Sequence, residues 1–340
     1  MRMTFDPNSA SDPDSGIFGL PHTPEQARVV LVPVPFEATA SYGAGAAEAP
    51  GAILRASRQV DLFDVETGRA YEAGIALLPE PESVRAWNAE ARRAARSATA
   101  GDRSSCDRAR VDALCERMNA WVRATVQRWL EAGKIVGVLG GDHSVSFAAI
   151  EAHARLHPGL GILHIDAHAD LRHAYEGFTW SHASIMDNVL ERIPDVARVV
   201  QVGVRDLCDE EFMRIERSAG RVHTWFDAEL ARERFEGVTW ARQVERIVEQ
   251  LPRDVYISFD VDALDPKLCP HTGTPVPGGL SFSQATYLVA RAVRSGRRLV
   301  GFDLVEVAPG ASASEWDANV GARVLYKLAG WAIRSAGAGA

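Results

Sequence analysis

The sequence has little cysteine and no long apolar run. Its 340 residues include four cysteines, none of them in a CxxC pair: Cys106, Cys115, Cys208 and Cys269. This scatter fits neither a zinc knuckle nor a disulfide framework, so we expect reduced thiols. No stretch approaches the length of a membrane span, and residues 1–9 lack the apolar core of a signal peptide. We therefore expect a cytoplasmic protein without a membrane partner.

The chain also lacks an excess of positive charge. It carries 37 Lys and Arg against 45 Asp and Glu, a formal net charge of -8 at pH 7. No basic stripe that would follow a phosphate backbone is present, which argues against nucleic acid and anionic membrane surfaces as partners. With 46% hydrophobic residues, the chain is long enough to bury one large α/β core or two ordinary ones.

Short apolar runs alternate with helix-like stretches along the chain. Near-continuous apolar strands of this kind are typical of a parallel sheet that is covered on both faces. We predict an α/β protein with a three-layer α/β/α architecture and a central, mostly parallel β-sheet. Functional residues are then expected at the carboxyl ends of the strands. The predicted strands span residues 29–34, 135–139, 161–165, 199–204, 255–259 and 299–303.

Composition divides the chain into three parts. Residues 1–28 are rich in Asp, Ser and Pro and are expected to form a partly flexible N-terminal extension, which residues 17–21 could pin to the surface. Residues 29–335 contain no convincing linker and are expected to form one domain. Within it, residues 86–133 have helical periodicity interrupted by a polar stretch, which predicts two helices joined by a loop. Residues 336–340 are expected to form a flexible tail.

Candidate metal ligands follow three of the predicted strands. In an extended backbone, residues two apart project to the same side, so the side chains of Asp166-Ala167-His168-Ala169-Asp170 can converge. One such triplet can equally be a solvated turn, but its combination with Asp260-Val261-Asp262 and a Gly140-Gly141-Asp142-His143-Ser144 loop favours a metal site. The six candidate ligands are His143, Asp166, His168, Asp170, Asp260 and Asp262.

The charges of this set match two divalent cations. Four carboxylates buried together without metal would repel one another and be forced to protonate. Oxygen ligands with two imidazoles suit Mn²⁺, although Ni²⁺, Co²⁺ or Zn²⁺ would also coordinate. Two such cations lower the pKa of a shared water, which points to a hydrolase. We expect Mn²⁺ as the cofactor, with Ni²⁺ as the alternative.

These motifs resemble those of the arginase and agmatinase superfamily of ureohydrolases. The matching segments are Gly140–Ser144, Asp166–Asp170 and Ser258–Asp262, and the resemblance covers residues 29 to 330. It implies the arginase-like fold and two metal ions. One ion would be held by His143, Asp166, Asp170 and Asp260, and the other by Asp166, His168, Asp260 and Asp262.

The resemblance also implies roles in the reaction. Glu306 matches the carboxylate that binds the substrate guanidinium, and a planar fork of donors does favour a facing carboxylate. His182 matches a loop histidine that transfers protons and contacts substrate, although it can also be an ordinary loop residue. Thr274 lies in a matching Thr272-Gly273-Thr274-Pro275 segment and is assigned to substrate binding. Asp142 is expected to orient His143.

The substrate is expected to be a small guanidino compound. Arginases carry Asn where this chain has Arg172, which favours the agmatinase branch and makes agmatine, cleaved to urea and putrescine, the leading hypothesis. Guanidine, guanidinobutyrate, guanidinopropionate and arginine stay open, as does a non-catalytic partner subunit of a ureohydrolase complex. Trp180 and Trp316 either narrow the pocket mouth or belong to the core or an interface. The resemblance implies a homo-oligomer, a trimer or hexamer.

Overall fold

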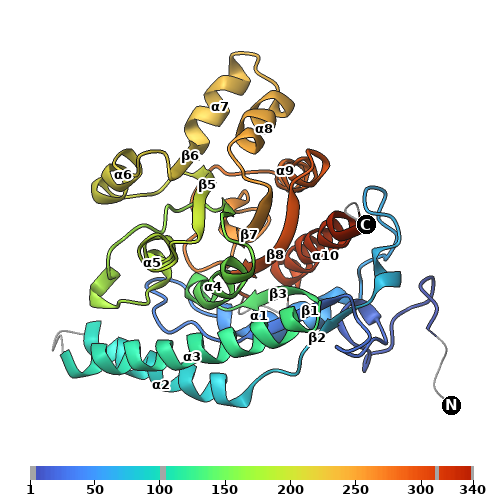
Figure 1. The fold of residues 1–340 in the computed structure, drawn as a ribbon. Helices are drawn as coiled ribbons and strands as arrows, with labels where there is room; N and C mark the ends of the chain where they lie inside the picture. Colours follow the sequence, from blue (N-terminus) through green and yellow to red (C-terminus); the bar gives the residue numbers. More distant parts are fainter. Residues whose placement is uncertain (1–4, 100–104, 311–313, 338–340) are drawn as a thin grey trace.

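The computed structural model describes residues 5–99, 105–310 and 314–337 (Figure 1). Its centre is one eight-stranded sheet with the order β2-β1-β3-β8-β7-β4-β5-β6, in which every pair of neighbouring strands is parallel. The strands are β1 Val29–Val34, β2 Ile75–Leu77, β3 Ile135–Gly140, β4 Leu160–Ile165, β5 Val196–Val204, β6 Val222–Phe226, β7 Asp254–Asp260 and β8 Arg298–Val305.

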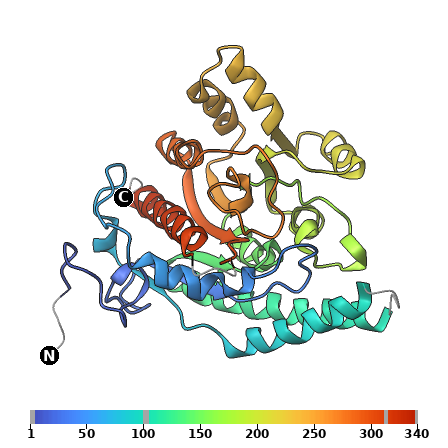
Figure 2. The same ribbon diagram turned by 180° about the vertical axis from the view of Figure 1, so that it is seen from behind.

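Helices cover both faces of the sheet, as Figures 1 and 2 show from opposite sides. Alternate residues of β1 point into different cores: Val29 and Leu31 into one, Val30 and Val32 into the other. The predicted three-layer architecture is therefore confirmed. The helices are α1 Ala49–Ser57, α2 Glu82–Thr99, α3 Ser105–Glu131, α4 Phe147–Leu156, α5 Ile185–Arg192, α6 Asp209–Glu216, α7 Asp227–Phe235, α8 Trp240–Glu249, α9 Phe282–Arg294 and α10 Trp316–Gly337.

The six predicted strands are all present, whereas the two strands at the sheet edges, β2 and β6, were not predicted. β2 has only three residues, too few to show a period. In β6 only Val222 is buried, so that strand lacks the continuous apolar run of a central strand. No helix in the described part of the chain combines the length and apolarity needed to cross a bilayer.

The predicted pair of helices between residues 86 and 133 is present as α2 and α3, whereas residues 100–104 of the predicted loop lie outside the described residues. α3 packs against β1, β3 and α4, and α2 lies on the outside of α3.

The described part of the N-terminal extension is anchored. Ile17, Phe18 and Leu20 are buried, and the backbone N–H of Phe18 donates to Ser57 Oγ at 2.8 Å. Of the tail expected at 336–340, residues 336 and 337 end α10, and residues 338–340 are outside the described range.

The sheet order explains where the motifs meet. The four neighbouring central strands are β3, β8, β7 and β4. Because they are parallel, their carboxyl ends lie at one edge, and the segments that follow them carry His143, Glu306, Asp262 and the Asp166–Asp170 triplet.

Candidate metal centre and active-site pocket

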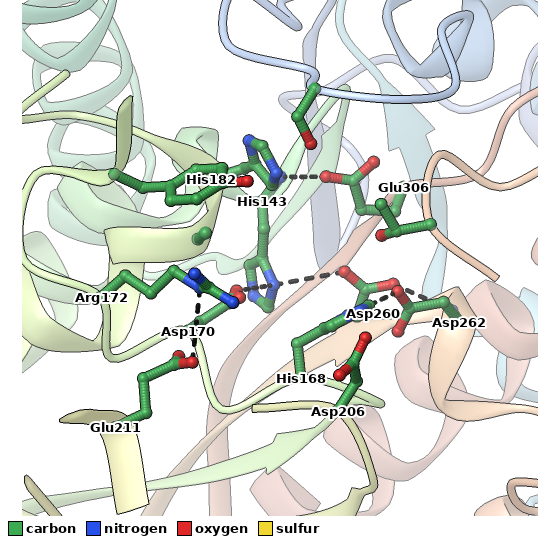
Figure 3. Close-up of a pocket in the computed structure, with 14 residues that line it drawn as sticks. His143, His168, Asp170, Arg172, His182, Asp206, Glu211, Asp260, Asp262 and Glu306 are labelled. Carbon is green, nitrogen blue, oxygen red and sulfur yellow. Dashed lines mark hydrogen bonds and ion pairs between the residues drawn. The ribbon is translucent and has the colours of Figure 1, made fainter. Parts of the chain in front are cut away.

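The first half of the candidate metal centre surrounds the imidazole of His143. Its Nδ1 lies 3.0 Å from Asp166 Oδ2, 3.1 Å from Asp170 Oδ2 and 3.3 Å from Asp260 Oδ2. All four side chains are buried. The carboxylates come from two different strand ends, and Figure 3 shows Asp170 and Asp260 on opposite sides of the imidazole.

The second half lies beside the first and shares Asp166 with it. His168 Nδ1 is 3.0 Å from Asp262 Oδ2 and 3.6 Å from Asp166 Oδ1. Ligand atoms of these three residues lie within 4.8 Å of one another. The structure thus brings all six predicted ligands into two adjacent groups.

The donor set fits divalent cations better than it fits a metal-free site. His143 Nδ1 is buried and makes no hydrogen bond, although three carboxylate oxygens surround it at hydrogen-bond distance. Burial opposes protonation of His143, but contacts to Asp166, Asp170 and Asp260 outweigh it and raise the pKa well above the ordinary value. Burial and the charges of Asp262 and Asp166 likewise raise the pKa of Asp260. A cation between these oxygens would remove this repulsion.

A buried hydrogen-bond chain holds the His143 ring. His143 Nε2 lies 2.8 Å from Ser258 Oγ, which donates to Asp303 Oδ1 at 3.0 Å. Since the only hydroxyl hydrogen of Ser258 goes to Asp303, Ser258 accepts from His143, so Nε2 carries the proton. Nδ1, which faces the carboxylates, is then free to bind a metal ion.

His164 supports the site from behind. A ring nitrogen of His164 lies within 4.8 Å of ligand atoms of the His143 group, but both ring nitrogens of His164 already form hydrogen bonds. Nδ1 accepts from Gln201 Nε2 at 3.0 Å, so Nε2 carries the hydrogen that is donated to Asp166 Oδ2 at 2.7 Å. His164 therefore orients Asp166.

Two of the site carboxylates stand on left-handed backbone. Asp170 has φ 55° and Glu306 has φ 61°, a conformation that non-glycine residues seldom adopt. Tertiary hydrogen bonds hold the second: Glu306 N donates to Gly141 O at 2.8 Å, and Thr272 Oγ1 donates to Glu306 O at 2.9 Å. This backbone turns the Glu306 side chain into the pocket, where His143 N donates to Oε1 at 2.9 Å (Figure 3).

His182 lines the same pocket from the loop before α5. Its Nδ1 and its backbone N–H each lie 3.1 Å from Thr39 Oγ1. Burial, and then the charges of His168 and His143, lower the pKa of His182 to about 4. The ring is therefore neutral at pH 7 and able to accept a proton.

The pocket is small, with a volume of about 140 Å³. Of the site residues predicted from the sequence, eight line the pocket: His143, His168, Asp170, His182, Asp260, Asp262, Thr274 and Glu306. Other lining residues were not predicted, because they come from separate loops and from the first turn of α6 without a shared spacing: Ser41, Tyr175, Asp206 and Glu211. Arg172, which the sequence singled out, also lines the pocket.

The other residues singled out from the sequence lie around the site or away from it. Asp142 accepts a hydrogen bond from Ser144 N at 3.1 Å and so caps the turn that begins at His143, without contacting its ring. Trp180 packs against Phe147 with ring centroids 4.9 Å apart. Trp316 is half exposed and donates to Lys267 O at 3.1 Å. Neither tryptophan lines the pocket.

Comparison with known proteins identifies the family. An N(1)-aminopropylagmatine ureohydrolase of Thermus thermophilus is 37% identical over 86% of this chain and 87% of its own length. The Bacillus subtilis agmatinase is 34% identical over 58% of this chain and 64% of its own length. The agmatine ureohydrolase structure from Thermoplasma volcanium covers 93% of this chain and 94% of its own, with a TM-score of 0.73 and 24% identity. The model of the arginase family matches residues 27–330, so this chain belongs to the arginase family, as its motifs indicate.

Proposed function

We propose that this chain is a ureohydrolase that cleaves the C–N bond between the guanidinium carbon and the tail of a small guanidino compound, yielding urea and an amine. The observation that carries the proposal is the placement of Glu306 in the same small pocket as the two groups around His143 and His168. A guanidinium needs a facing carboxylate, and the reaction needs an activated water beside its carbon.

Two divalent cations would be held by the six residues of the centre, with Asp166 and Asp260 shared between them. When bound, the cations supply Lewis acidity and make water nucleophilic at neutral pH. We propose Mn²⁺ because carboxylates dominate the donor set, with Ni²⁺ as the alternative.

Glu306 binds the substrate guanidinium. Burial, and then the charge of Asp142, raise the pKa of Glu306 well above its ordinary value, so a cation beside it stabilises the ionised form. His143 N already donates to Oε1, which holds the carboxylate in place and leaves Oε2 for the guanidinium.

His182 transfers the proton. The attacking water forms the new C–O bond and gives up a proton, and the tail nitrogen must receive one as the C–N bond breaks. His182 is neutral at pH 7, lies in the pocket, and is held by Thr39. It can therefore take the first proton and deliver it to the leaving nitrogen.

The pocket wall supports a substrate with a cationic tail. Asp206 lines the pocket outside the metal ligands, and its carboxylate would attract an ammonium group, whereas the Glu211 carboxylate already accepts from Leu171 N and Cys208 N. Relatives of this chain are named agmatinase and N(1)-aminopropylagmatine ureohydrolase. We propose agmatine as the substrate, with its N(1)-aminopropyl derivative as the longer candidate.

Arg172 favours a second candidate, a guanidino acid. Its Nε lies 3.4 Å from Glu211 Oε2, and its guanidinium stacks on Tyr175 at 4.8 Å. Its guanidinium reaches into the pocket (Figure 3) and could pair with a tail carboxylate. Guanidinobutyrate and guanidinopropionate are the compounds of this kind to compare.

The test is a urea-release screen after loading with Mn²⁺ or Ni²⁺. The substrates are agmatine, N(1)-aminopropylagmatine, guanidine, arginine, guanidinobutyrate and guanidinopropionate. We expect kcat/KM to be highest for an amine-tailed compound, and Asp206→Asn to lower it more than Arg172→Gln does. If Arg172→Gln instead lowers kcat/KM more than Asp206→Asn does, the pocket binds a guanidino acid. If no compound releases urea with either metal, the proposed function is refuted and a non-catalytic subunit is favoured.

We also propose assembly into a trimer or hexamer and a cytoplasmic location, both on the family resemblance. Light scattering of the purified chain tests the first, and cell fractionation the second.

A further inference from the structure

The helix α2 has no assigned function in the site, yet it contacts the loop formed by residues 36–47. This 36–47 loop runs from the end of β1 to the start of α1. It supplies Ser41 to the pocket and Thr39 to His182. Neither helix α2 nor the 36–47 loop carries a candidate metal ligand.

Glu37 is the point of contact between the two. Its backbone N–H donates to Asn88 Oδ1 at 2.8 Å, and its carbonyl accepts from Arg92 Nη1 at 3.2 Å. Arg92 also forms an ion pair with the Glu37 carboxylate. Glu37 and Asn88 are buried, and the Arg92 side chain is only 21% exposed, so solvent screens these contacts weakly.

The second oxygen of the Glu37 carboxylate holds the far end of the same loop. Oε2 accepts from Gly45 N at 2.7 Å and from Ala47 N at 3.3 Å. Glu37 therefore closes the loop on itself, while Arg92 and Asn88 attach it to α2. Removing Arg92 would leave a buried carboxylate without its cation.

The 36–47 loop in turn touches three loops of the active site. Phe36 O accepts from Asp142 N at 2.9 Å, next to His143. Gly43 N donates to Gly273 O at 2.9 Å, beside Thr274. Thr39 Oγ1 accepts from His182 N at 3.1 Å.

We propose that Arg92 and Asn88 of α2 are positioning residues, which hold the 36–47 loop through Glu37 and thereby keep Thr39 against His182. This inference rests on the proposed role of His182 in proton transfer. In this role α2 does more than cover α3, because it orders a loop whose polar groups reach the pocket. Misplacement of a reacting group by about 1 Å can cost on the order of a hundredfold in rate.

The experiment compares Arg92→Ala and Asn88→Ala with Arg93→Ala, which removes the same charge from an exposed position on the same helix. Arg92→Lys keeps a cation for Glu37 and serves as the rescue variant. Each protein is loaded with Mn²⁺ and assayed for urea release, and hydrogen exchange is followed in peptides covering residues 36–47 and 180–184.

We expect Arg92→Ala to lower kcat by about ten- to a hundredfold, with a change in KM of less than about threefold. Exchange should speed up in both peptides but not in β4 or β7. Asn88→Ala should show the same pattern more weakly, Arg92→Lys should recover part of the loss, and Arg93→Ala should match the wild type.

Equal exchange in Arg92→Ala and Arg93→Ala would overturn the proposal, and so would faster exchange with an unchanged kcat. If Arg92→Ala fails to fold, the kcat and the hydrogen exchange of Asn88→Ala test the proposal instead. If the wild type releases no urea at all, the proposed function fails, whereas the exchange data still report whether α2 holds the loop.

Discussion

Gly141 lies so close to Phe36 that a Cβ on Gly141 would stand 1.9 Å from the Phe36 carbonyl oxygen. The two backbones are also joined, because Asp142 N donates to that same oxygen at 2.9 Å. A side chain at position 141 would therefore push apart the loop that carries His143 and the end of β1.

We expect Gly141→Ala to destabilise the protein by about 1–3 kcal/mol, as overpacking of a tight contact does, and to weaken metal binding. Thermal unfolding and metal titration measure the two effects. Gly51→Ala is the control, since its Cβ would meet nothing closer than Arg55 Nη1 at 3.6 Å. Equal stability of the two variants would show that the contact is not tight in solution.

Ser258→Ala removes the acceptor that holds the proton on His143 Nε2. The ring can then turn or change tautomer, and we expect metal affinity to fall by about 10–100-fold, as loss of such a supporting contact does. Metal titration measures this directly, and exposed Ser283→Ala on α9 is the control. Unchanged affinity in Ser258→Ala would mean that the carboxylates alone orient the imidazole.

Glu306→Gln keeps the size of the side chain and removes its charge. Because a neutral amide binds a guanidinium much less well than a carboxylate, we expect kcat/KM to fall by about a hundredfold or more, equivalent to about 3 kcal/mol. Steady-state urea release on the best substrate measures it, with exposed Glu249→Gln as the control. Wild-type kinetics on every guanidino compound would refute the assignment of Glu306.

Removal of metal should lower both activity and stability. A ligand present at a hundred times its Kd stabilises the folded state by about 2.7 kcal/mol, so chelation should lower Tm by several degrees. His168→Ala and Asp260→Ala should abolish urea release and bind less metal while remaining soluble. Full turnover by either purified variant would contradict the two-metal assignment.

Acid should destabilise the protein partly through His153, a buried residue of α4 away from the metal centre. Burial lowers its pKa to about 4, whereas in the unfolded chain its pKa is about 6.5. The unfolded state therefore binds more protons between these two pH values, and the stability contributed by neutral His153 is lost as pH falls from 6.5 toward 4.

The His153→Gln variant tests this contribution. We expect the fall of Tm between pH 6.5 and 4 to be smaller in His153→Gln than in the wild type, because the glutamine side chain does not titrate. Exposed His173→Gln provides the control. Parallel Tm curves for wild type and His153→Gln would exclude a contribution from His153.

The architecture and the position of the candidate site could be predicted from sequence because both depend on local patterns. Central strands such as β4 are almost continuously apolar and are buried along their whole length, since helices cover both faces. The polar triplet after β4 spaces its side chains two residues apart. The same reasoning could not find Asp206 or Glu211, which follow β5 with no metal-like spacing and reach the pocket only because β5 pairs with β4.

The order of residues alone determined that this chain forms a parallel α/β sheet of the arginase family and carries six potential metal ligands after its strands. Tertiary structure decided which of them meet, because the strand order β3-β8-β7-β4 differs from the chain order and brings His143, Glu306 and Asp260 to one edge. It also decided the tautomer of His143, through Ser258, and the contact of Glu37 with Asn88 of α2. Such contacts join residues about 50 to 160 positions apart, so no local pattern in the sequence records them.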